Sequence, residues 1–296
     1  KIAIIYAVGG IVSGTSNTGP QGSTTMGDKT IINAIKSARN DSSVEAIILR
    51  IDSGGGLATA SEQMWREIYK TTSDTINNKP FIASMSGAAA SGGYYIACFA
   101  DTIVAQPSTV TGSIGVVSLG FNISELYKKI GINKEVIKRG EFSDFLTQSR
   151  EFNDEENRKM VESTEYFYKV FKDRVLEGRK NLTAEQLEEL ALGRIWSGTT
   201  AAKNGLVDEI GGIHKSIEIA KSMAGLQDVE VDVIEYPQND IPSSFSRKNN
   251  NVQLQSKLIF DLLPENIQKE LNKLNVIPLL YDEKIYFMMP HSIEIN

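Results

Sequence analysis

The sequence has few of the residues that build covalent and metal frameworks. Its 296 residues contain one cysteine, Cys98, and two histidines, His214 and His291. A single cysteine cannot form an intrachain disulfide or a cysteine-based zinc site. A chain of this length buries about 75% of its unfolded surface, so it needs neither kind of crosslink to be stable. We therefore expect a globular protein with no metal or other cofactor.

Long runs of one residue class are also missing. Lys and Arg total 31 against 37 Asp and Glu, a formal net charge of -6, and no long basic run occurs. Nucleic acid is therefore not an expected partner. No window approaches 18 consecutive apolar residues, so the pattern predicts no membrane-spanning helix. Because the chain starts without Met and inside an apolar run, we expect it to be a piece of a longer polypeptide.

Strand-like runs alternate with helical patterns along most of the chain. Residues 1–7 and 45–51 are β-branched runs, typical of strands buried on both faces, and glycines follow each of them. Further strands are predicted at 81–85, 102–105 and 229–234. Helices are predicted at 28–38, with Asp28 as cap, and at 61–75, 91–97, 122–130, 155–177, 183–190 and 213–224. This rhythm predicts an α/β fold with a mostly parallel sheet.

The composition changes near residue 236. Residues 237–253 are polar and read as a linker, and a helix is predicted around residues 264–274. We therefore predict one domain over residues 1–235, followed by a linker and a helical C-terminal extension over residues 236–296.

Ser91 is the first candidate for chemistry. It lies in Ala90-Ser91-Gly92-Gly93-Tyr94, directly after a predicted strand and at the start of a helix. Small neighbours leave its hydroxyl uncrowded, and the helix N-terminus supplies unpaired N–H groups and a positive potential. These features suit a nucleophile, although small residues at a helix start can also serve tight packing.

A glycine cluster, Asp52-Ser53-Gly54-Gly55-Gly56, follows the strand at 45–51. Its backbone N–H groups can face a ligand, which suits a developing oxyanion. A phosphate-binding loop would need Lys followed by Ser or Thr after the last glycine, whereas Leu57-Ala58 follows here. A sharp turn without a ligand is the remaining alternative.

A serine nucleophile needs a base, and histidine is scarce. Ser91, Asp208 and His214 occur in the chain order of an α/β-hydrolase triad, but a separation of six positions between the last two is cramped for that fold. A surface role for His214 is the simpler interpretation. Lysine is then the base to look for, because desolvation can lower its pKa towards neutrality.

Four motifs together resemble the signal peptide peptidase A family, also called protease IV. They are Asp52-Ser53-Gly54-Gly55-Gly56, Ala90-Ser91-Gly92-Gly93-Tyr94-Tyr95, Thr111-Gly112-Ser113-Ile114-Gly115-Val116, and Trp196-Ser197-Gly198 with Gly205-Leu206-Val207-Asp208. The resemblance covers about residues 1–235. It implies the Clp-type protease and crotonase-like fold, a spiral of ββα units, and cleavage by a Ser/Lys dyad.

The resemblance also implies roles for individual residues. Ser91 corresponds to the nucleophile, and Ser113 to the serine that orients the lysine base. The oxyanion hole corresponds to the N–H groups of Gly92 and of the Gly55-Gly56 pair, with Gly56 preferred. Gly54 stands where the family usually has Pro, which loosens the turn without removing a donor.

The lysine itself is missing from its expected place. Single-unit members carry it after a stretch like Val136 to Gly140, but this chain has Ser143 at the matching position. Lys138 reads as an exposed strand residue. In two-unit members the first half carries the lysine and the second the serine, so the chain resembles a second half. A lysine-bearing half or chain and homo-oligomer formation are then expected.

The resemblance further implies a substrate class and a location. Family members hydrolyse cleaved signal peptides and other hydrophobic peptides at the outer, periplasmic face of the cell inner membrane, anchored by a segment that this chain lacks. A catalytically inactive peptide-binding scaffold is the alternative, since the base is missing. A crotonase-like thioester enzyme is a third hypothesis, which the absence of a recognisable acidic base disfavours.

Overall fold

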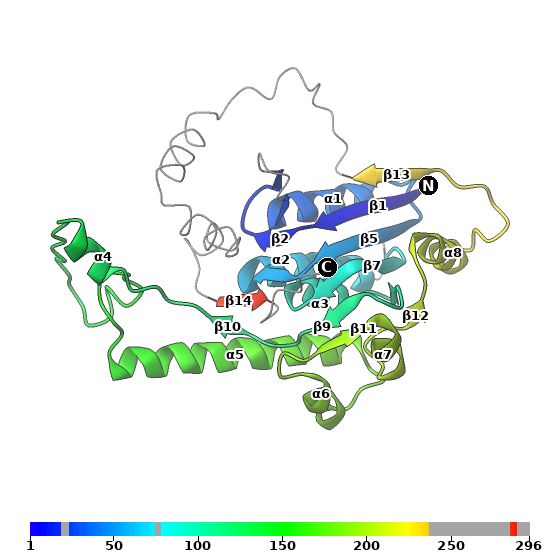
Figure 1. Ribbon diagram of the computed structural model, residues 1–296. Helices are drawn as coiled ribbons and strands as arrows, with labels where there is room; N and C mark the ends of the chain where they lie inside the picture. The colour runs from blue at the N-terminus through cyan, green and yellow to red at the C-terminus, as the bar shows by residue number, and fades with distance from the viewer. Residues whose placement is uncertain (19–23, 75–77, 237–284, 289–296) are drawn as a thin grey trace, which may run out of the picture.

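The computed structural model describes residues 1–18, 24–74 and 78–236 and the backbone of 285–288. Within these residues the strands form two sheets (Figure 1). The first has the order β11-β9-β7-β5-β1-β13, with β8 beside β7 and β12 beside β8, and the second has the order β10-β14-β6-β2-β4-β3. The predicted helix at 264–274 lies outside the described residues, and the domain boundary at residue 235 stays a prediction.

The strands of the first sheet are mostly parallel, and only the β9–β11 pair is antiparallel. Its strands are β1 (Ile2–Val8), β5 (Ala46–Ser53), β7 (Phe81–Ala90), β8 (Thr102–Ala105), β9 (Val110–Gly112), β11 (Ile195–Ser197), β12 (Glu209–Ile210) and β13 (Val233–Tyr236). Those of the second sheet are β2 (Gly10–Val12), β3 (Asn17–Thr18), β4 (Thr24–Gly27), β6 (Gly55–Leu57), β10 (Val117–Ser118) and β14 (Ile285–Met288).

Helices follow the strands and complete ββα units. They are α1 (Asp28–Asn40), α2 (Ala58–Ser73), α3 (Gly92–Ala97), α4 (Ser124–Lys129), α5 (Asp154–Gly178), α6 (Ala184–Leu190), α7 (Gly198–Lys203) and α8 (Ile213–Met223). In the unit β5-β6-α2 one strand lies in each sheet before the helix begins, and β1 and β2 divide between the sheets in the same way before α1. The predicted α/β class, with a largely parallel sheet, is confirmed.

The central strands are buried on both faces, as their apolar runs predict. Along β1, Ala3 and Ile5 belong to the main core with α1, α2 and α3, whereas Ile2 and Ile4 belong to a second cluster with α8. Alternate side chains of a strand point to opposite faces, so an unbroken apolar run needs a cover on both. Helices on the two faces supply that cover.

Some boundaries differ from the sequence-based expectation. The N-cap of α1 is Gly27, not Asp28; the Asp28 carboxylate instead accepts from the N–H groups of Gly14 and Lys29, each at 2.7 Å. The predicted strand at 229–234 forms at Val233–Tyr236, where it pairs with β1. Residues 81–85 are strand as predicted, but β7 continues to Ala90 because it pairs with β9 there.

Residues 119–152, which include α4, form an arm that extends away from the two sheets (Figure 1). None of its residues is buried. Its large exposed apolar side chains are Leu119, Phe121, Leu126, Ile130, Ile132, Val136, Ile137 and Leu146, and Ile137 is 92% exposed. No helix among the described residues is long and apolar enough to cross a bilayer.

Candidate active site

Ser91 occupies the junction between β7 and α3. It is the N-cap of α3, with φ 52° and ψ -117°. A positive φ is uncommon for a residue with a side chain, and such backbone persists where the surroundings hold it in place. Here the Ser91 N–H donates to the Gly112 carbonyl at 2.9 Å, and its own carbonyl accepts from the Tyr95 N–H at 2.8 Å. The main chain of this serine is therefore anchored on both sides.

Ser113 lies at the matching point of the neighbouring strand. Strands β7 and β9 are parallel, with Ala90 opposite Gly112, so Ser91 and Ser113 are the next residues on adjacent strands. Ser113 also has a positive φ, 50°, and its N–H donates to the Arg194 carbonyl at 2.7 Å. The fold thus brings together the two serines that the motifs single out.

Both hydroxyls are buried and unpartnered. The Oγ atoms of Ser91 and Ser113 are shielded from solvent, and neither has a hydrogen-bond partner within the described part of the chain. A buried hydroxyl left unpaired costs about 1–3 kcal/mol, so each one needs an explanation. No lysine or histidine of the described residues is therefore hydrogen-bonded to Ser91.

The glycine cluster lies directly against the start of α3. Gly55 and Gly56 have φ 108° and 155°, values that favour glycine. A Cβ built on Gly56 would lie 2.2 Å from the Ile11 carbonyl oxygen, and one on Gly92 would lie 3.2 Å from the Gly55 Cα. The structure therefore packs Gly92, the residue after Ser91, against Gly55, and packs the next glycine, Gly56, against the backbone of β2; a side chain at Gly92 or Gly56 would push these segments apart.

Ser53 holds the glycine cluster in this conformation. Its Oγ donates to the Gly9 carbonyl at 2.7 Å and accepts from the Gly55 N–H at 3.1 Å. Because the Gly55 N–H is engaged in this way, Gly56 and Gly92 remain as the candidate oxyanion donors. The sequence interpretation considered only the glycines of this motif. A serine two residues before a turn glycine was the available signal.

The first residue of this motif fixes the neighbouring strand. The Asp52 carboxylate accepts from the Ala88 N–H at 3.0 Å, at a register shift in the β5–β7 pairing. A Cβ on Gly93 would lie 2.6 Å from the Ser53 carbonyl oxygen, so the serine motif and the glycine motif fit against each other through bare backbone.

Helix α3 is supported from behind by buried aromatic side chains. The Tyr94 hydroxyl donates to the Leu206 carbonyl at 2.9 Å, and burial raises the pKa of Tyr94 well above its ordinary value. The Tyr95 hydroxyl donates to Glu62, which also receives Arg174 at 2.8 Å. Tyr94 and Tyr95 are fully buried core residues. Their role is to position α3.

The motif that contains Trp196 and Asp208 supports the Ser113 segment and excludes a triad of Ser91, Asp208 and His214. Trp196 lies opposite Thr111, and a Cβ on Gly112 would lie 2.7 Å from the Trp196 ring. The Asp208 carboxylate accepts from the Ile103 N–H at 2.7 Å and from Arg179. His214 lies exposed on α8. The α/β-hydrolase hypothesis, which needed Ser91, Asp208 and His214 in one hydrogen-bonded chain, is wrong.

The two positions considered for the base lie on the arm. The Lys138 Nζ is 2.9 Å from Asp144 Oδ1, and the Ser143 hydroxyl donates to the Gly140 carbonyl at 3.0 Å. Lys138 is exposed as predicted, although its segment is irregular and not a strand. Neither side chain contacts Ser91.

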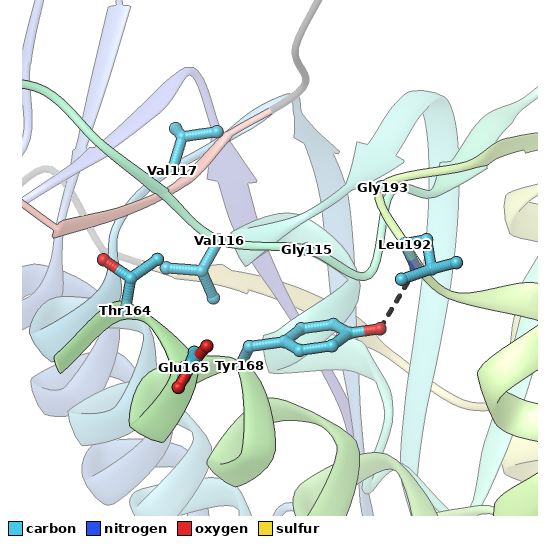
Figure 2. Close-up of a pocket in the computed structure, with 8 residues that line it drawn as sticks. All are labelled: Gly115, Val116, Val117, Thr164, Glu165, Tyr168, Leu192 and Gly193. Atoms are coloured by element: carbon cyan, nitrogen blue, oxygen red, sulfur yellow. Dashed lines mark hydrogen bonds between the residues drawn. The ribbon is translucent and has the colours of Figure 1, made fainter. Parts of the chain in front are cut away.

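A cavity of about 320 Å³ lies beside the segment that follows Ser113. It is lined by Gly115, Val116 and Val117, by Thr164, Glu165 and Tyr168 of α5, and by Leu192 and Gly193. Figure 2 shows Val116 pointing toward α5, and the Tyr168 hydroxyl accepting from the Leu192 N–H at 3.2 Å. The cavity offers an apolar space beside the residues that follow Ser113 in the chain.

Comparison with known proteins gives consistent matches. A family model described as peptidase family S49 matches residues 74–227. The chain is 39% identical over 269 residues to the chloroplastic serine protease SPPA of Arabidopsis thaliana, covering 90% of this chain and 39% of that protein. It is 36% identical over 231 residues to protease 4 of Salmonella typhi, covering 78% of this chain and 36% of that protein.

The chain spans about two fifths of the length of these curated relatives. Among solved structures, a mutant of ClpP1 from Listeria monocytogenes is similar over 71% of this chain and 91% of its own, with 14% identity and a TM-score of 0.42.

Proposed function

The chain belongs to peptidase family S49, a family of serine peptidases, and from that premise we propose that it is the serine-bearing part of a Ser/Lys endopeptidase. One observation carries the proposal: Ser91 and Ser113 end adjacent parallel strands, and both have buried, unpartnered hydroxyls within the part of the chain that the structure describes. The glycines that could bind an oxyanion lie against the same helix start. A serine beside backbone donors suits the nucleophile of an acyl transfer, for which a base and access for the substrate are also needed.

The proposed chemistry has two steps. A lysine amine takes the Ser91 proton as Oγ attacks the peptide carbonyl, and the Gly56 and Gly92 N–H groups stabilise the oxyanion. The lysine then protonates the leaving amine, which departs and leaves an acyl-enzyme. Water, deprotonated by the same lysine, hydrolyses this ester and regenerates Ser91. Ser113 orients the lysine through its hydroxyl.

The lysine comes, in this proposal, from a homologous half or another chain. Lys138 is paired with Asp144, and Ser143 stands where the family's single-unit members carry the base. The arm's many exposed apolar side chains give such a partner a surface to cover. Homo-oligomer formation through the same surface is part of the proposal.

Substrates and location are proposed on the same basis. We expect cleaved signal peptides and other hydrophobic peptides as substrates, and the cavity beside Ser113 is apolar enough to take an aliphatic side chain. We place the catalytic part at the periplasmic face of the inner membrane.

An inactive peptide-binding scaffold is the second candidate function. It is favoured by one observation, that no amine or imidazole of the described residues is hydrogen-bonded to either serine hydroxyl. The two candidates differ in whether a complete assembly hydrolyses peptides through Ser91.

The test is hydrolysis of an apolar peptide by the complete assembly, that is, the chain together with its lysine-bearing half. Ser91→Ala should abolish hydrolysis, and Ser113→Ala should lower kcat by about tenfold to a hundredfold because the lysine loses its orienting partner. The matched control, Lys138→Ala, should leave the rate within about twofold. Activity that survives Ser91→Ala would rule out the peptidase proposal, and an assembly inactive with every partner half would favour the scaffold.

A further inference from the structure

A second cavity lies at the far end of the helix that begins after Ser91. It has a volume of about 550 Å³ and is bordered by the second half of α2, the end of α5 and Phe99, which follows the C-cap of α3. A Cβ on Gly178, the last residue of α5, would lie 2.0 Å from the Cys98 carbonyl oxygen, so these walls meet closely. The whole length of α3 separates the cavity from the candidate nucleophile.

The charged side chains around this cavity are mostly positive. Four cations line it, Arg66, Lys70, Arg174 and Lys180, and one carboxylate, Glu177. The whole chain has a formal net charge of -6, so the lining is opposite in sign to the average of the protein. A cavity lined by one sign of charge concentrates ligands of the opposite sign, which here are anions.

Two of these cations are not paired within the protein. Lys70 Nζ and Arg174 Nη2 lie 3.9 Å and 2.8 Å from glutamate carboxylates of α2. Arg66 and Lys180 are exposed and form no ion pair with any residue that the structure describes. A helix C-terminus favours cations only near its last turn, which explains Lys180 but not Arg66, about two turns before the end of α2. The guanidinium of Arg66 is therefore free for a ligand.

Aromatic rings form the rest of the wall. Trp65, Tyr69 and Phe99 line the cavity and pack together, with ring centroids 4.9, 5.3 and 5.6 Å apart. Tyr69 is 41% exposed, whereas Trp65 is buried and its indole N–H has no acceptor among the described residues, an arrangement that is costly to leave unpaired. The Arg174 guanidinium lies 4.0 Å from the centroid of the Trp65 ring, so the cationic and aromatic walls are continuous.

We propose that this cavity binds a small phosphorylated aromatic molecule of the nucleoside phosphate class. Arg and Lys side chains suit phosphate oxygens, and a planar base stacks on an aromatic ring. Arg66 and Lys180 hold the phosphate, and Tyr69 offers the base an exposed ring. The volume falls in the range of roughly 300–1,000 Å³ that is usual for small-molecule sites. The site is distinct from the one that contains Ser91, and it does not depend on peptidase activity.

The first test is titration calorimetry of the full chain with three probes: adenosine monophosphate (AMP), inorganic phosphate and adenosine. We expect AMP to bind with a Kd below about 1 mM at low salt and more weakly as salt is added. Phosphate and adenosine, which each carry half of the proposed recognition, should both bind at least about tenfold more weakly than AMP. No binding of AMP, or a Kd for either other probe equal to that for AMP, would overturn the proposal.

Two double variants of equal net charge test the cations. Arg66→Ala with Lys180→Ala should weaken AMP binding by about tenfold to a hundredfold, because charge-assisted hydrogen bonds to the phosphate are lost. The matched control, Lys29→Ala with Lys129→Ala, removes the same charge at exposed positions outside the cavity and should change the Kd by less than about twofold. All four side chains are exposed, so thermal unfolding should be unchanged in both variants. Equal weakening in the two variants would reduce the effect to overall charge and overturn the site.

Two further measurements check the place and the source of the ligand. Photolabelling with an azido-substituted AMP should mark peptides from residues 65–73, 99 or 174–180, and labelling confined to other peptides would overturn the site. Vesicles that contain phosphatidylglycerol carry phosphate without an aromatic group, and we expect them not to displace AMP. Displacement by these vesicles would assign the cavity to a lipid headgroup and overturn the nucleoside phosphate as its ligand.

Discussion

Replacing Ser53 by alanine tests whether one hydroxyl maintains the candidate oxyanion hole. This side chain is almost fully buried, and its Oγ bonds the Gly9 carbonyl and the Gly55 N–H. Alanine fits in the same space but makes neither bond. The glycine cluster then loses the contact that fixes its distance from β1 and its orientation toward Gly92.

The size of the effect follows from the two groups left behind. A buried polar group without a partner costs about 1–3 kcal/mol, so two of them lower the free energy of unfolding by roughly 2–6 kcal/mol. Losing an oxyanion donor costs about 100- to 1000-fold in kcat; we expect about tenfold to a hundredfold for a donor that is displaced but present. KM should change little, because the donor acts on the transition state.

The assay combines urea unfolding of the chain with kcat and KM of the complete assembly. Ser43→Ala is the matched control, since the Ser43 hydroxyl donates to Asp41 at 2.7 Å in a partly exposed turn before β5. It should cost less than about 1 kcal/mol and leave kcat unchanged. The reasoning is refuted if Ser53→Ala raises KM at constant kcat, or if the two variants behave alike.

Two further predictions concern packing at the site and the base of the arm. Gly93→Ala should lower the free energy of unfolding by about 1–3 kcal/mol, because the new Cβ would lie 2.6 Å from the Ser53 carbonyl oxygen. The control Gly87→Ala, whose new Cβ has its nearest contact at 3.4 Å, should change the free energy of unfolding by less than about 0.5 kcal/mol. Equal urea midpoints for the two variants would contradict this prediction. Hydrogen bonds from Arg150 lower the pKa of Glu156 from 4.5 to about 2 and hold the pKa of Asp144 below its ordinary range. The Arg150 hydrogen bonds therefore stabilise the start of α5 fully above pH 4.5, and this stabilisation is lost as the pH falls toward 2. Hydrogen exchange in the first two turns of α5, corrected for its intrinsic pH dependence, should accelerate over that range in the wild-type chain, while Arg150→Ala should exchange fast throughout.

Most elements were predictable because their residues carry a local pattern. The β-branched runs at the start of the chain and at Ala46–Ser53 form strands buried on both faces, and α5 begins and ends within one residue of the predicted 155–177. The extension of β7 to Ala90 was missed, since Ser, Gly and Ala have no apolar alternation and that stretch is strand only because β9 lies beside it. Strand β13 lies further along than predicted because pairing with β1 sets its register.

The candidate site divides in the same way. Ser91, Gly92, Gly55, Gly56 and Ser113 could be named from motifs, because small residues and glycines at strand ends are visible in one dimension. Their arrangement could not. The adjacency of Ser91 and Ser113 follows from the β7–β9 register, and the role of Ser53 follows from the Gly9 carbonyl just beyond the end of β1.

The sequence alone determined the α/β class, the nucleophile candidate and the absence of a lysine at its expected position, because strand and helix periods, small-residue motifs and a missing side chain are properties of neighbouring residues. Only the tertiary structure decided which glycine N–H groups remain for an oxyanion, that Asp208 and His214 are not partners of Ser91, and that β14 lies between β6 and β10. Those outcomes depend on hydrogen bonds between segments far apart in the chain, for which no local pattern exists.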